Sequence, residues 1–477
     1  MTAVGLDDLK TILSLNGITA NAMLVKVIFT SFLTIICLGS CHTVIIPDHK
    51  VQNELNSNLN FSTPSSENSI PEKLTLHLAR EAALKGNPGL QAAELRILRA
   101  RAIVRQAKSL YFPTLNATVG ARHQHHVPKG QFGFSTASYE NYRSALTSQW
   151  LIFDGFAREF KVLAAKYGEL ATKESYNDSQ RMLLDAVSQS FYQTILALKE
   201  MEINHEIKEI NLKFLQDSEI KMKAGTVGRT EVNNFKVNVN DAEIAYLEAR
   251  NNFEISKIIL AELLGAPEAS LEKVMPVFKI FEVSVPEEKT AIQIALNKRP
   301  DIKALQAEIL ALEAQIKEAR GEYFPKFYLE GSYGTSSFER AEFGDDKRDS
   351  YLGATMSWDL FTGNSTAGLI AQRKAEKGEK LKLLKSQWFQ TVSEIRQQRK
   401  SLLNVIEKLE VQTRTEALSK SIYEDTKVIF DNGATTITRV NEVLTNYSVA
   451  KLNKVLFEIE AVRRRDILNS LMGINLK

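Results

Sequence analysis

Cysteine is nearly absent from this 477-residue sequence, and neither sign of charge is in large excess. Cys37 and Cys41 are the only cysteines, so disulfides cannot hold together the residues that follow them. The 60 basic and 57 acidic residues give a net charge of +3. This balance lacks the basic surplus that nucleic-acid binding requires, so we expect no nucleic-acid partner.

Proline is absent from two long stretches of the chain. All eleven prolines lie at positions 47 to 325, with none between Pro128 and Pro267 and none after Pro325. Because proline interrupts helices, both gaps permit long continuous helices.

Motifs of catalysis and cofactor binding are also missing. The sequence has no Ser/His/Asp set, phosphate-binding loop or metal motif in a recognisable context. His123, His125 and His126 lie close together, but no cysteine or carboxylate stands at ligand spacing from them. We therefore expect a protein that is not an enzyme and that holds neither a metal nor a cofactor.

One pattern is present twice. Tyr-Phe-Pro at residues 111–113 is followed by a Trp-x-x-Phe-x-Gly segment from Trp150, and the same order returns at residues 323–325 and from Trp358. The triplets are 212 residues apart and the tryptophans 208, because the second hairpin tip is four residues shorter. The protein therefore consists of two copies of one unit of about 200 residues.

Residues 1–41 contain an export signal. A lysine precedes twelve uncharged residues, 27–38, which are too few to span a membrane as a helix. The acidic first part does not resemble a signal start, which leaves Met23 as an alternative initiator. Leu-Gly-Ser-Cys, ending at Cys41, resembles the bacterial lipoprotein processing motif, in which the cysteine becomes lipidated. The alternative is an incidental cysteine in an ordinary signal peptide. Within the resemblance, His42 in place of aspartate favours outer-membrane sorting.

Both copies contain the same order of expected elements. The first copy spans residues 73–270 and the second spans 287–477, with a tether at 42–72 and a linker at 271–286. Each copy has two helices, a β-hairpin, a long helix and a shorter return helix. The hairpins are expected at residues 114–154 and 326–362.

The hairpin segments alternate between apolar and polar residues. The last strand is the clearest, with Leu352, Ala354, Met356, Trp358 and Leu360 on one face and small or polar residues on the other. We expect four strands of about ten residues, each with one apolar and one polar face.

The long helices have the pattern of coiled coils. The helix expected at residues 156–223 would reach about 100 Å, which exceeds the width of a globular core. Apolar residues recur at every seventh position in both long helices, as in a coiled-coil seam. These positions are Leu184, Phe191, Leu198 and Leu212 in the first helix, and Leu381, Trp388, Ile395, Leu402 and Leu409 in the second.

Aromatic residues mark the ends of the expected strands, namely Trp150, Phe153, Trp358 and Phe361. Such residues are typical of membrane β-barrels, where they lie at the interfaces. Four strands cannot close, and an open edge in lipid would leave backbone groups unsatisfied at several kcal/mol each. Three chains would supply twelve strands, whereas two would give an eight-stranded barrel filled by side chains. We therefore expect a mixed α and β membrane protein, mostly of long helical coiled coils, in which each chain contributes four strands to a trimeric twelve-stranded β-barrel.

The order of elements, used twice with Tyr-Phe-Pro before the first strand and Trp-x-x-Phe-x-Gly at the strand exit, resembles the TolC family of outer-membrane factors. Cys41 extends this resemblance to the lipoprotein branch of the family. The resemblance covers residues 73–477 and implies a homotrimer, lipid-anchored in the outer membrane, with a large periplasmic helical tunnel. It also implies the exit channel of a tripartite efflux system, whose partners are a periplasmic adaptor and an inner-membrane pump, proton-driven or ATP-driven.

Two other functions compete with this one. A duct for type I protein secretion has the same architecture, but the lipoprotein signal is commoner among efflux members. An exported coiled-coil scaffold without a pore is disfavoured, because it has no use for four lipid-compatible strand faces.

The resemblance implies a gate at the periplasmic ends of the long helices. Glu231 follows Gly225 by six residues, and Arg439 and Glu442 follow Gly433 by six and nine. Arg439 stands where the family commonly has a carboxylate, so Arg439 is expected to pair with Glu231 or Glu442. The alternative is that all three are solvated charges at helix ends.

The tip turns are the expected docking points of the adaptor. They contain Gly225, Gly228 and Gly433. The alternative is that these glycines simply end helices.

Overall fold

The structure is a computed structural model. It describes residues 73–126, 129–130, 133–134, 137–266, 275–277, 284–338 and 348–474. All of these belong to one compact unit, Ser66–Lys477. The export signal with Cys41, the tether and most of the expected linker lie outside the described residues.

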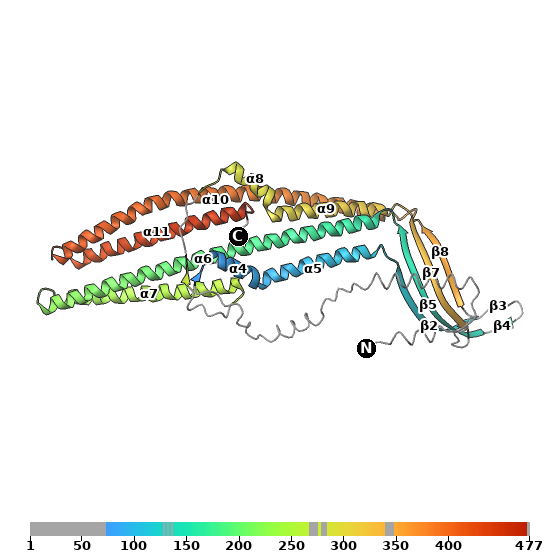
Figure 1. Ribbon diagram of the computed structural model, residues 1–477, viewed down its shortest axis with the longest axis horizontal. Coiled ribbons are helices and arrows are strands. Elements are labelled where there is room, and N and C mark those ends of the chain that lie inside the picture. Colours follow the sequence, from blue (N-terminus) through green and yellow to red (C-terminus); the bar gives the residue numbers. More distant parts are fainter. Residues whose placement is uncertain are drawn as a thin grey trace. The chain divides into compact units, whose positions relative to one another are not determined.

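The two copies contain helices of matching length, as expected from the duplication (Figure 1). The 11-residue helices are α4 (Leu76–Gly86) and α8 (Glu288–Lys298), and the 22-residue helices are α5 (Pro88–Ser109) and α9 (Pro300–Gly321). The 67-residue helices are α6 (Ala157–Lys223) and α10 (Ser365–Asp431), with return helices α7 (Arg229–Leu264) and α11 (Ile437–Leu471). The mainly helical fold and the internal duplication are therefore confirmed.

The four long strands form one antiparallel sheet in the order β2-β5-β7-β8. They are β2 (Thr114–His126), β5 (Ala137–Phe153), β7 (Lys326–Phe338) and β8 (Arg348–Ser357). Polar residues face polar residues across the ladder, as in the pairs Asn116 and Thr147, Gln149 and Glu330, and Tyr328 and Thr355. The apolar and polar faces are thus continuous over all four strands.

The strand lengths differ from the ten residues expected. Strands β2, β5 and β7 contain 13, 17 and 13 residues, and only β8 has 10. Because β8 ends at Ser357, the expectation that Trp358 and Leu360 lie within the last strand is wrong. The indole N–H of Trp358 instead donates to the carbonyl oxygen of Tyr323 at 3.1 Å, which holds it against the turn before β7.

Two pairs of short strands were not expected from the sequence. Strand β1 (Lys73–Leu74) pairs in parallel with β6 (Met275–Pro276), and β3 (Lys129–Gly130) pairs with β4 (Gly133–Phe134). Segments of two residues are too short to show a period of two, so the sequence gives no alternation signal for them.

Glycines with positive φ end the return helices at equivalent positions. Gly265 has φ 75° and Gly473 has φ 67°, a region that favours glycine. Both glycines also allow a neighbouring backbone to approach closely. An added Cβ on Gly265 would collide with the carbonyl of Gly86, and an added Cβ on Gly473 would lie 2.9 Å from the backbone nitrogen of Arg299. Each return helix is therefore seated on the junction between the two short helices of its own copy.

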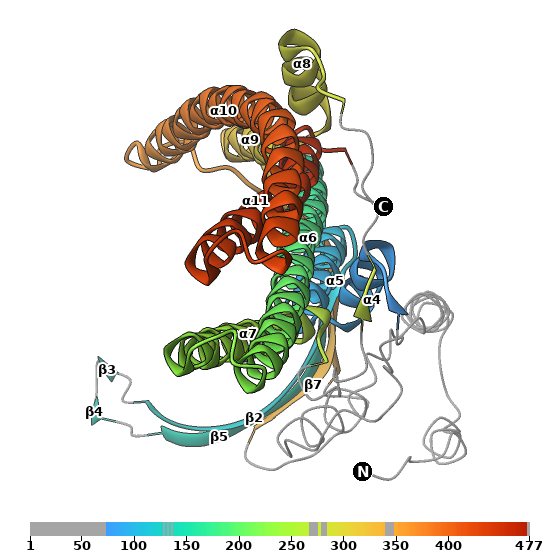
Figure 2. The same ribbon diagram turned by 90° about the vertical axis from the view of Figure 1, so that its left-hand side faces the viewer.

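Helix α6 contacts α5, α7, α9 and α11, and α10 contacts α8, α9 and α11. Seen along the helices, α4 and α8 lie on the convex side of the curved helical layer (Figure 2). The seam residues Leu184, Phe191 and Leu198 of α6 are buried, as their spacing predicts. In α10 the seam is only partly covered within one chain, because Leu381 is 46% exposed and Trp388 41%.

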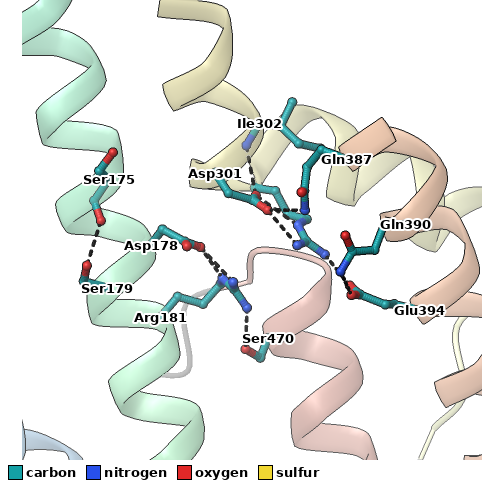
Figure 3. Close-up of polar contacts among 11 residues, drawn as sticks. Ser175, Asp178, Ser179, Arg181, Asp301, Ile302, Gln387, Gln390, Glu394 and Ser470 are labelled. Carbon is teal, nitrogen blue, oxygen red and sulfur yellow. Dashed lines mark hydrogen bonds and ion pairs between the residues drawn. The ribbon is translucent and has the colours of Figure 1, made fainter. Parts of the chain in front are cut away.

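A buried arginine joins the second pair of short helices to α10. Arg299, at the junction of α8 and α9, contacts Asp301 at 2.7 Å and Glu394 at 3.1 Å. Both of these carboxylates are labelled in Figure 3. Gln387 of α10 also donates to Asp301 at 3.0 Å. Burial alone would raise the pKa of Asp301, but the hydrogen bonds and charge of Arg299 outweigh it and hold that pKa below its usual value. Arg181 of α6 lies nearby and donates to Ser470 of α11 at 3.3 Å.

We predict that Arg299→Met lowers the free energy of unfolding by about 3 kcal/mol, because two partly buried carboxylates lose their partner. Denaturant unfolding followed by circular dichroism measures the change. The matched control is Arg414→Met, which breaks an exposed pair with Glu410 and should cost less than about 1 kcal/mol. Equal losses in the two variants would contradict the role of the buried arginine.

Candidate functional site at the helical tips

The ends of the two helical hairpins have the same backbone geometry. Gly225 has φ 74° and Gly433 has φ 76°. The N–H of Thr226 donates to the carbonyl of Lys221 at 3.0 Å, and that of Ala434 donates to Ile429 at 3.0 Å. The N–H groups of Gly225 and Gly433 donate to the carbonyls of Met222 and Phe430. Together these bonds form the Schellman arrangement that ends a helix on a left-handed glycine.

The three tip glycines named from the sequence are exposed. An added Cβ on Gly225, Gly228 or Gly433 would meet no atom within 4 Å in the chain. Gly225 and Gly433 are therefore required for their backbone conformation and not for space, and the surface beside them is open. Gly228 precedes α7 with extended backbone and has no such requirement.

Arg439 pairs with Glu442 and not with Glu231. The guanidinium of Arg439 lies 2.8 Å from the carboxylate of Glu442, three residues further along α11, and both side chains are more than half exposed. Glu231 stands in the first turn of α7, and no ion pair among the described residues involves it. An exposed pair within one helix contributes about 0.5 kcal/mol and links no second helix, so it cannot by itself hold the hairpins together.

Aromatic side chains join the two hairpins close to their tips. Phe214 of α6, Phe235 of α7 and Phe430 of α10, here called the tip cluster, have ring centroids 6.0 to 6.4 Å apart. Phe235 is fully buried. The ammonium of Lys221 lies 4.9 Å from the ring centroid of Phe430, which adds a cation–π contact across the same junction. The three rings join the two hairpins near the tips, where they pack with buried apolar residues of α11 that include Val440 and Leu444.

The tip cluster was missed by the sequence reasoning, which searched for acidic residues beside the tip glycines. Phe214 and Phe235 stand on either side of Gly225 in the sequence, and Phe430 precedes Gly433, which was the available signal. Their spacing along one helix does not reveal a cluster, because its three members come from three helices.

Further from the tips, α11 is tied to the first copy by buried polar contacts. The hydroxyl of Tyr192 in α6 donates to Asp466 at 2.6 Å, and Arg80 of α4 lies 3.1 Å from the same carboxylate. Burial, followed by the charge of Asp466, raises the pKa of Tyr192, so this hydroxyl stays protonated and acts as a donor. Closer to the tips, Lys451 of α11 contacts Glu206 of α6 at 2.5 Å.

The four aromatic residues named from the sequence lie at the junction of sheet and helices. Trp150 donates to the carbonyl of Tyr111 at 2.9 Å, the counterpart of the bond made by Trp358. Phe153 is the last residue of β5 and packs 6.1 Å from the ring of Phe327. Phe361, beyond β8, is the most exposed of the four at 84%.

The described part of the chain contains no group of three or more His, Cys, Asp or Glu residues that could hold a metal ion. In the same residues, none of the helices combines the length and the apolarity needed to cross a bilayer.

Each copy contains one long helical hairpin and two strands of an open four-stranded sheet. This arrangement, present twice in one chain, defines the fold of outer-membrane channel proteins. The chain belongs to the outer membrane efflux protein family, whose model matches residues 79–266 and 291–474. This membership confirms the resemblance to the TolC family, and the two matched segments coincide with the two copies.

Individual relatives are distant. Protein CyaE of Bordetella pertussis is 24% identical over 308 residues, 64% of each chain. The pyoverdine export outer membrane protein OpmQ of Pseudomonas aeruginosa is 26% identical over 295 residues, 59% of this chain and 60% of OpmQ. The matched segments therefore span less than two thirds of either relative.

Solved structures share the fold over most of their length. The outer-membrane channel OprN is 19% identical with a TM-score of 0.72, covering 84% of this chain and 90% of OprN. The CmeC outer membrane channel of Campylobacter jejuni is 18% identical with a TM-score of 0.73, covering 83% of this chain and 85% of CmeC.

We predict that Phe430→Ala loosens the junction of the two hairpins, because it removes one ring from a packed set of three. Spin labels at positions 226 and 434 should show a broader distance distribution by pulsed electron resonance. Leu418→Ala, at a position of the same helix that is 66% exposed, serves as the control and should leave the distribution unchanged. An unaltered distribution in Phe430→Ala would show that other contacts hold the tips.

Proposed function

We propose that the protein is the outer-membrane exit channel of a tripartite efflux system, formed by three copies of the chain. The observation that carries this proposal is the open four-stranded sheet with one continuous apolar face. Strands β2 and β8 are the two edges of that sheet within the chain. An apolar sheet with free edges is stable in a bilayer only if other copies supply the missing strand partners.

The duplication indicates how the copies associate. Within the chain, α6 of the first copy packs against α9 of the second. The equivalent pair is α10 with α5, and we propose that this pair forms between neighbouring chains. Both helices carry exposed apolar residues suited to such a contact, namely Leu95 and Leu98 on α5, and Leu381, Trp388 and Phe389 on α10.

The glycines at the sheet exits support the same assignment. An added Cβ on Gly155 would lie 2.6 Å from the carbonyl oxygen of Gly321, the last residue of α9. Gly363 is the equivalent of Gly155, yet an added Cβ there would meet nothing within 4 Å. The counterpart of Gly321 is Ser109, at the end of α5, and in the proposed trimer it belongs to the next chain.

The remaining features follow from a duct of this kind. The apolar face of the sheet would contact outer-membrane lipid, with Trp150, Phe153, Trp358 and Phe361 at the interface, and Cys41 would carry a lipid anchor. The helical hairpins would project into the periplasm, where the tips at Gly225, Gly228 and Gly433 would meet a periplasmic adaptor bound to an inner-membrane pump. Efflux is preferred to type I protein secretion because relatives are named for pyoverdine export and solvent efflux. No chemical reaction is assigned to the protein.

We further propose that Glu231, Arg439 and Glu442 line the periplasmic gate, with the tip cluster as the contact that closes it. The polar pair alone is too weak for this task, whereas the three rings join both hairpins. Opening would then separate Phe430 from its two neighbours.

For the trimer, we predict that Trp388→Glu abolishes assembly, because it places a charge in an apolar contact between chains. The measurement is the heat-modifiable trimer band of the outer-membrane fraction on an unheated gel. Thr290→Glu, at an exposed position of α8, should assemble normally. A soluble, elongated monomer in the wild type would refute the channel itself.

For the gate, we predict that Arg439→Glu or Glu442→Arg raises single-channel conductance in planar bilayers, because in the proposed trimer each change makes the α11 tips of the three copies carry like charges, which repel one another. The exchanged double variant, Arg439→Glu with Glu442→Arg, restores an ion pair and should return conductance towards the wild-type value. If both single variants conduct like the wild type, these residues are not part of the gate.

A further inference from the structure

Two adjoining cavities lie between helices α5, α6 and α9, next to the sheet. One has a volume of about 700 Å³ and the other about 330 Å³. They share Leu110, Lys161, Gln315 and Glu318 and therefore adjoin each other, and the two together are here called the wall cavity.

The wall cavity opens on the polar side of the sheet. The smaller part is lined by Leu151 of β5 and Tyr328 of β7, which face each other across the ladder. Gln149, two residues before Leu151, lies on the same face and donates to Glu330 at 2.8 Å. Since the opposite face is apolar and would contact lipid, the wall cavity faces the lumen of the proposed channel.

Three positive side chains line the larger part of the wall cavity and form no ion pair with any described residue. They are Arg96 and Arg99 of α5 and Lys161 of α6. No ion pair or side-chain hydrogen bond within the described residues involves any of the three. Arg101, by contrast, pairs with Glu169 at 3.3 Å, and Glu169 also contacts Lys173 at 3.0 Å, so that cavity-lining carboxylate is already neutralised.

The remaining carboxylate of the larger part is Glu318. Burial raises its pKa, partly offset by the charges of Lys161 and Arg373. It therefore opposes an incoming negative charge less strongly than an exposed glutamate would. The amide oxygen of Gln315 is also buried beside it without a hydrogen-bond partner, so it can accept from a hydroxyl or an amide of a guest molecule.

The wall cavity also has an apolar component. Ala100 and Ile103 of α5, Ala164 of α6 and Ala311 of α9 line it beside the charged groups. Further along the sheet, the polar face continues with Arg122 and Arg143, as the strand pairing shows. Charged carboxylates occur there too, at Glu330 and Asp349, but Glu330 is already held by Gln149.

We propose that the wall cavity binds organic anions that have an apolar body, and that such anions are the class of compound the channel exports. Arg96, Arg99 and Lys161 would contact the carboxylate or sulfonate, and the alanines and Ile103 would contact the apolar part. This assignment rests on the proposed function as an export channel, because only there does the wall cavity face the path of the exported compound.

The test compares two surfactant-like ions of equal length in planar bilayers that contain the full-length protein from membranes. Octanoate should reduce the current through the open channel, and octylammonium at the same concentration should not. In the triple variant Arg96→Gln, Arg99→Gln, Lys161→Gln, the apparent affinity for octanoate should fall by about tenfold or more, because the charge-assisted contacts are lost.

A charge-matched control lies on the same two helices. Arg105→Gln, Lys108→Gln and Lys166→Gln together remove three exposed positive charges of α5 and α6 that do not line the wall cavity, and should leave octanoate block unchanged. An equal loss of octanoate affinity in this control would assign the block to the overall electrostatic field of the channel. That result would overturn a binding site in the wall cavity. Equal block by octanoate and octylammonium, or no block, would overturn the proposal while leaving the channel intact. Absence of any channel current would instead refute the proposed function.

Discussion

The backbone of the two edge strands sets the main constraint on this protein. Within the chain, β2 and β8 are each paired on one side only, and the sheet between them has an apolar face that water does not favour. In a bilayer, each unpaired backbone group costs several kcal/mol, which exceeds what any single side-chain contact in the chain could offset. Assembly with other copies is the direct way to satisfy both requirements. The arrangement of the strands then determines where α6 and α10 lie, because each of these long helices begins next to the sheet.

Contacts between the two hairpins change in character along their length. Near the junctions with the short helices, Asp466 of α11 holds a buried charged network with Arg80 and Tyr192 of the first copy, which is costly to break. Towards the tips, the contacts become an exposed ion pair at Lys451 and then the aromatic rings of the tip cluster. Aromatic contacts have weaker directional requirements than charge pairs, so rings can separate and meet again without leaving a buried charge behind.

Much of the architecture could be predicted from the sequence, because it depends on periodicity. The seven-residue spacing of Leu184, Phe191 and Leu198 identified a buried seam, and the alternation around Met356 identified a strand with two faces. Glycines such as Gly265 and Gly473 are required at equivalent positions by backbone geometry and by close packing. The two copies could therefore be aligned by a constant offset in the sequence. Periodicity and the positions of glycines can be read directly from the sequence.

The remaining features depend on contacts between distant segments. The tip cluster brings together Phe214, Phe235 and Phe430 from three helices, and no periodicity within one helix indicates it. Trp358 lies beyond the ladder because β7, which pairs with β8, begins at Lys326, opposite Ser357, and the alternation of one strand does not show where its partner begins. The wall cavity is a further example, since the three positive residues of its larger part come from two helices.

The distance along α11 from Asp466 to its first residue, Ile437, has a mechanical consequence. At 1.5 Å per residue this segment is about 44 Å long, so it acts as a lever whose short end is fixed by the buried contacts of Asp466. A tilt of about 10° at that fixed point would move the far end by about 8 Å, which is comparable to the separation of two packed helices. A small rotation at Asp466 therefore gives a large displacement at Ile437, and the force needed at that end is reduced by the length of the arm.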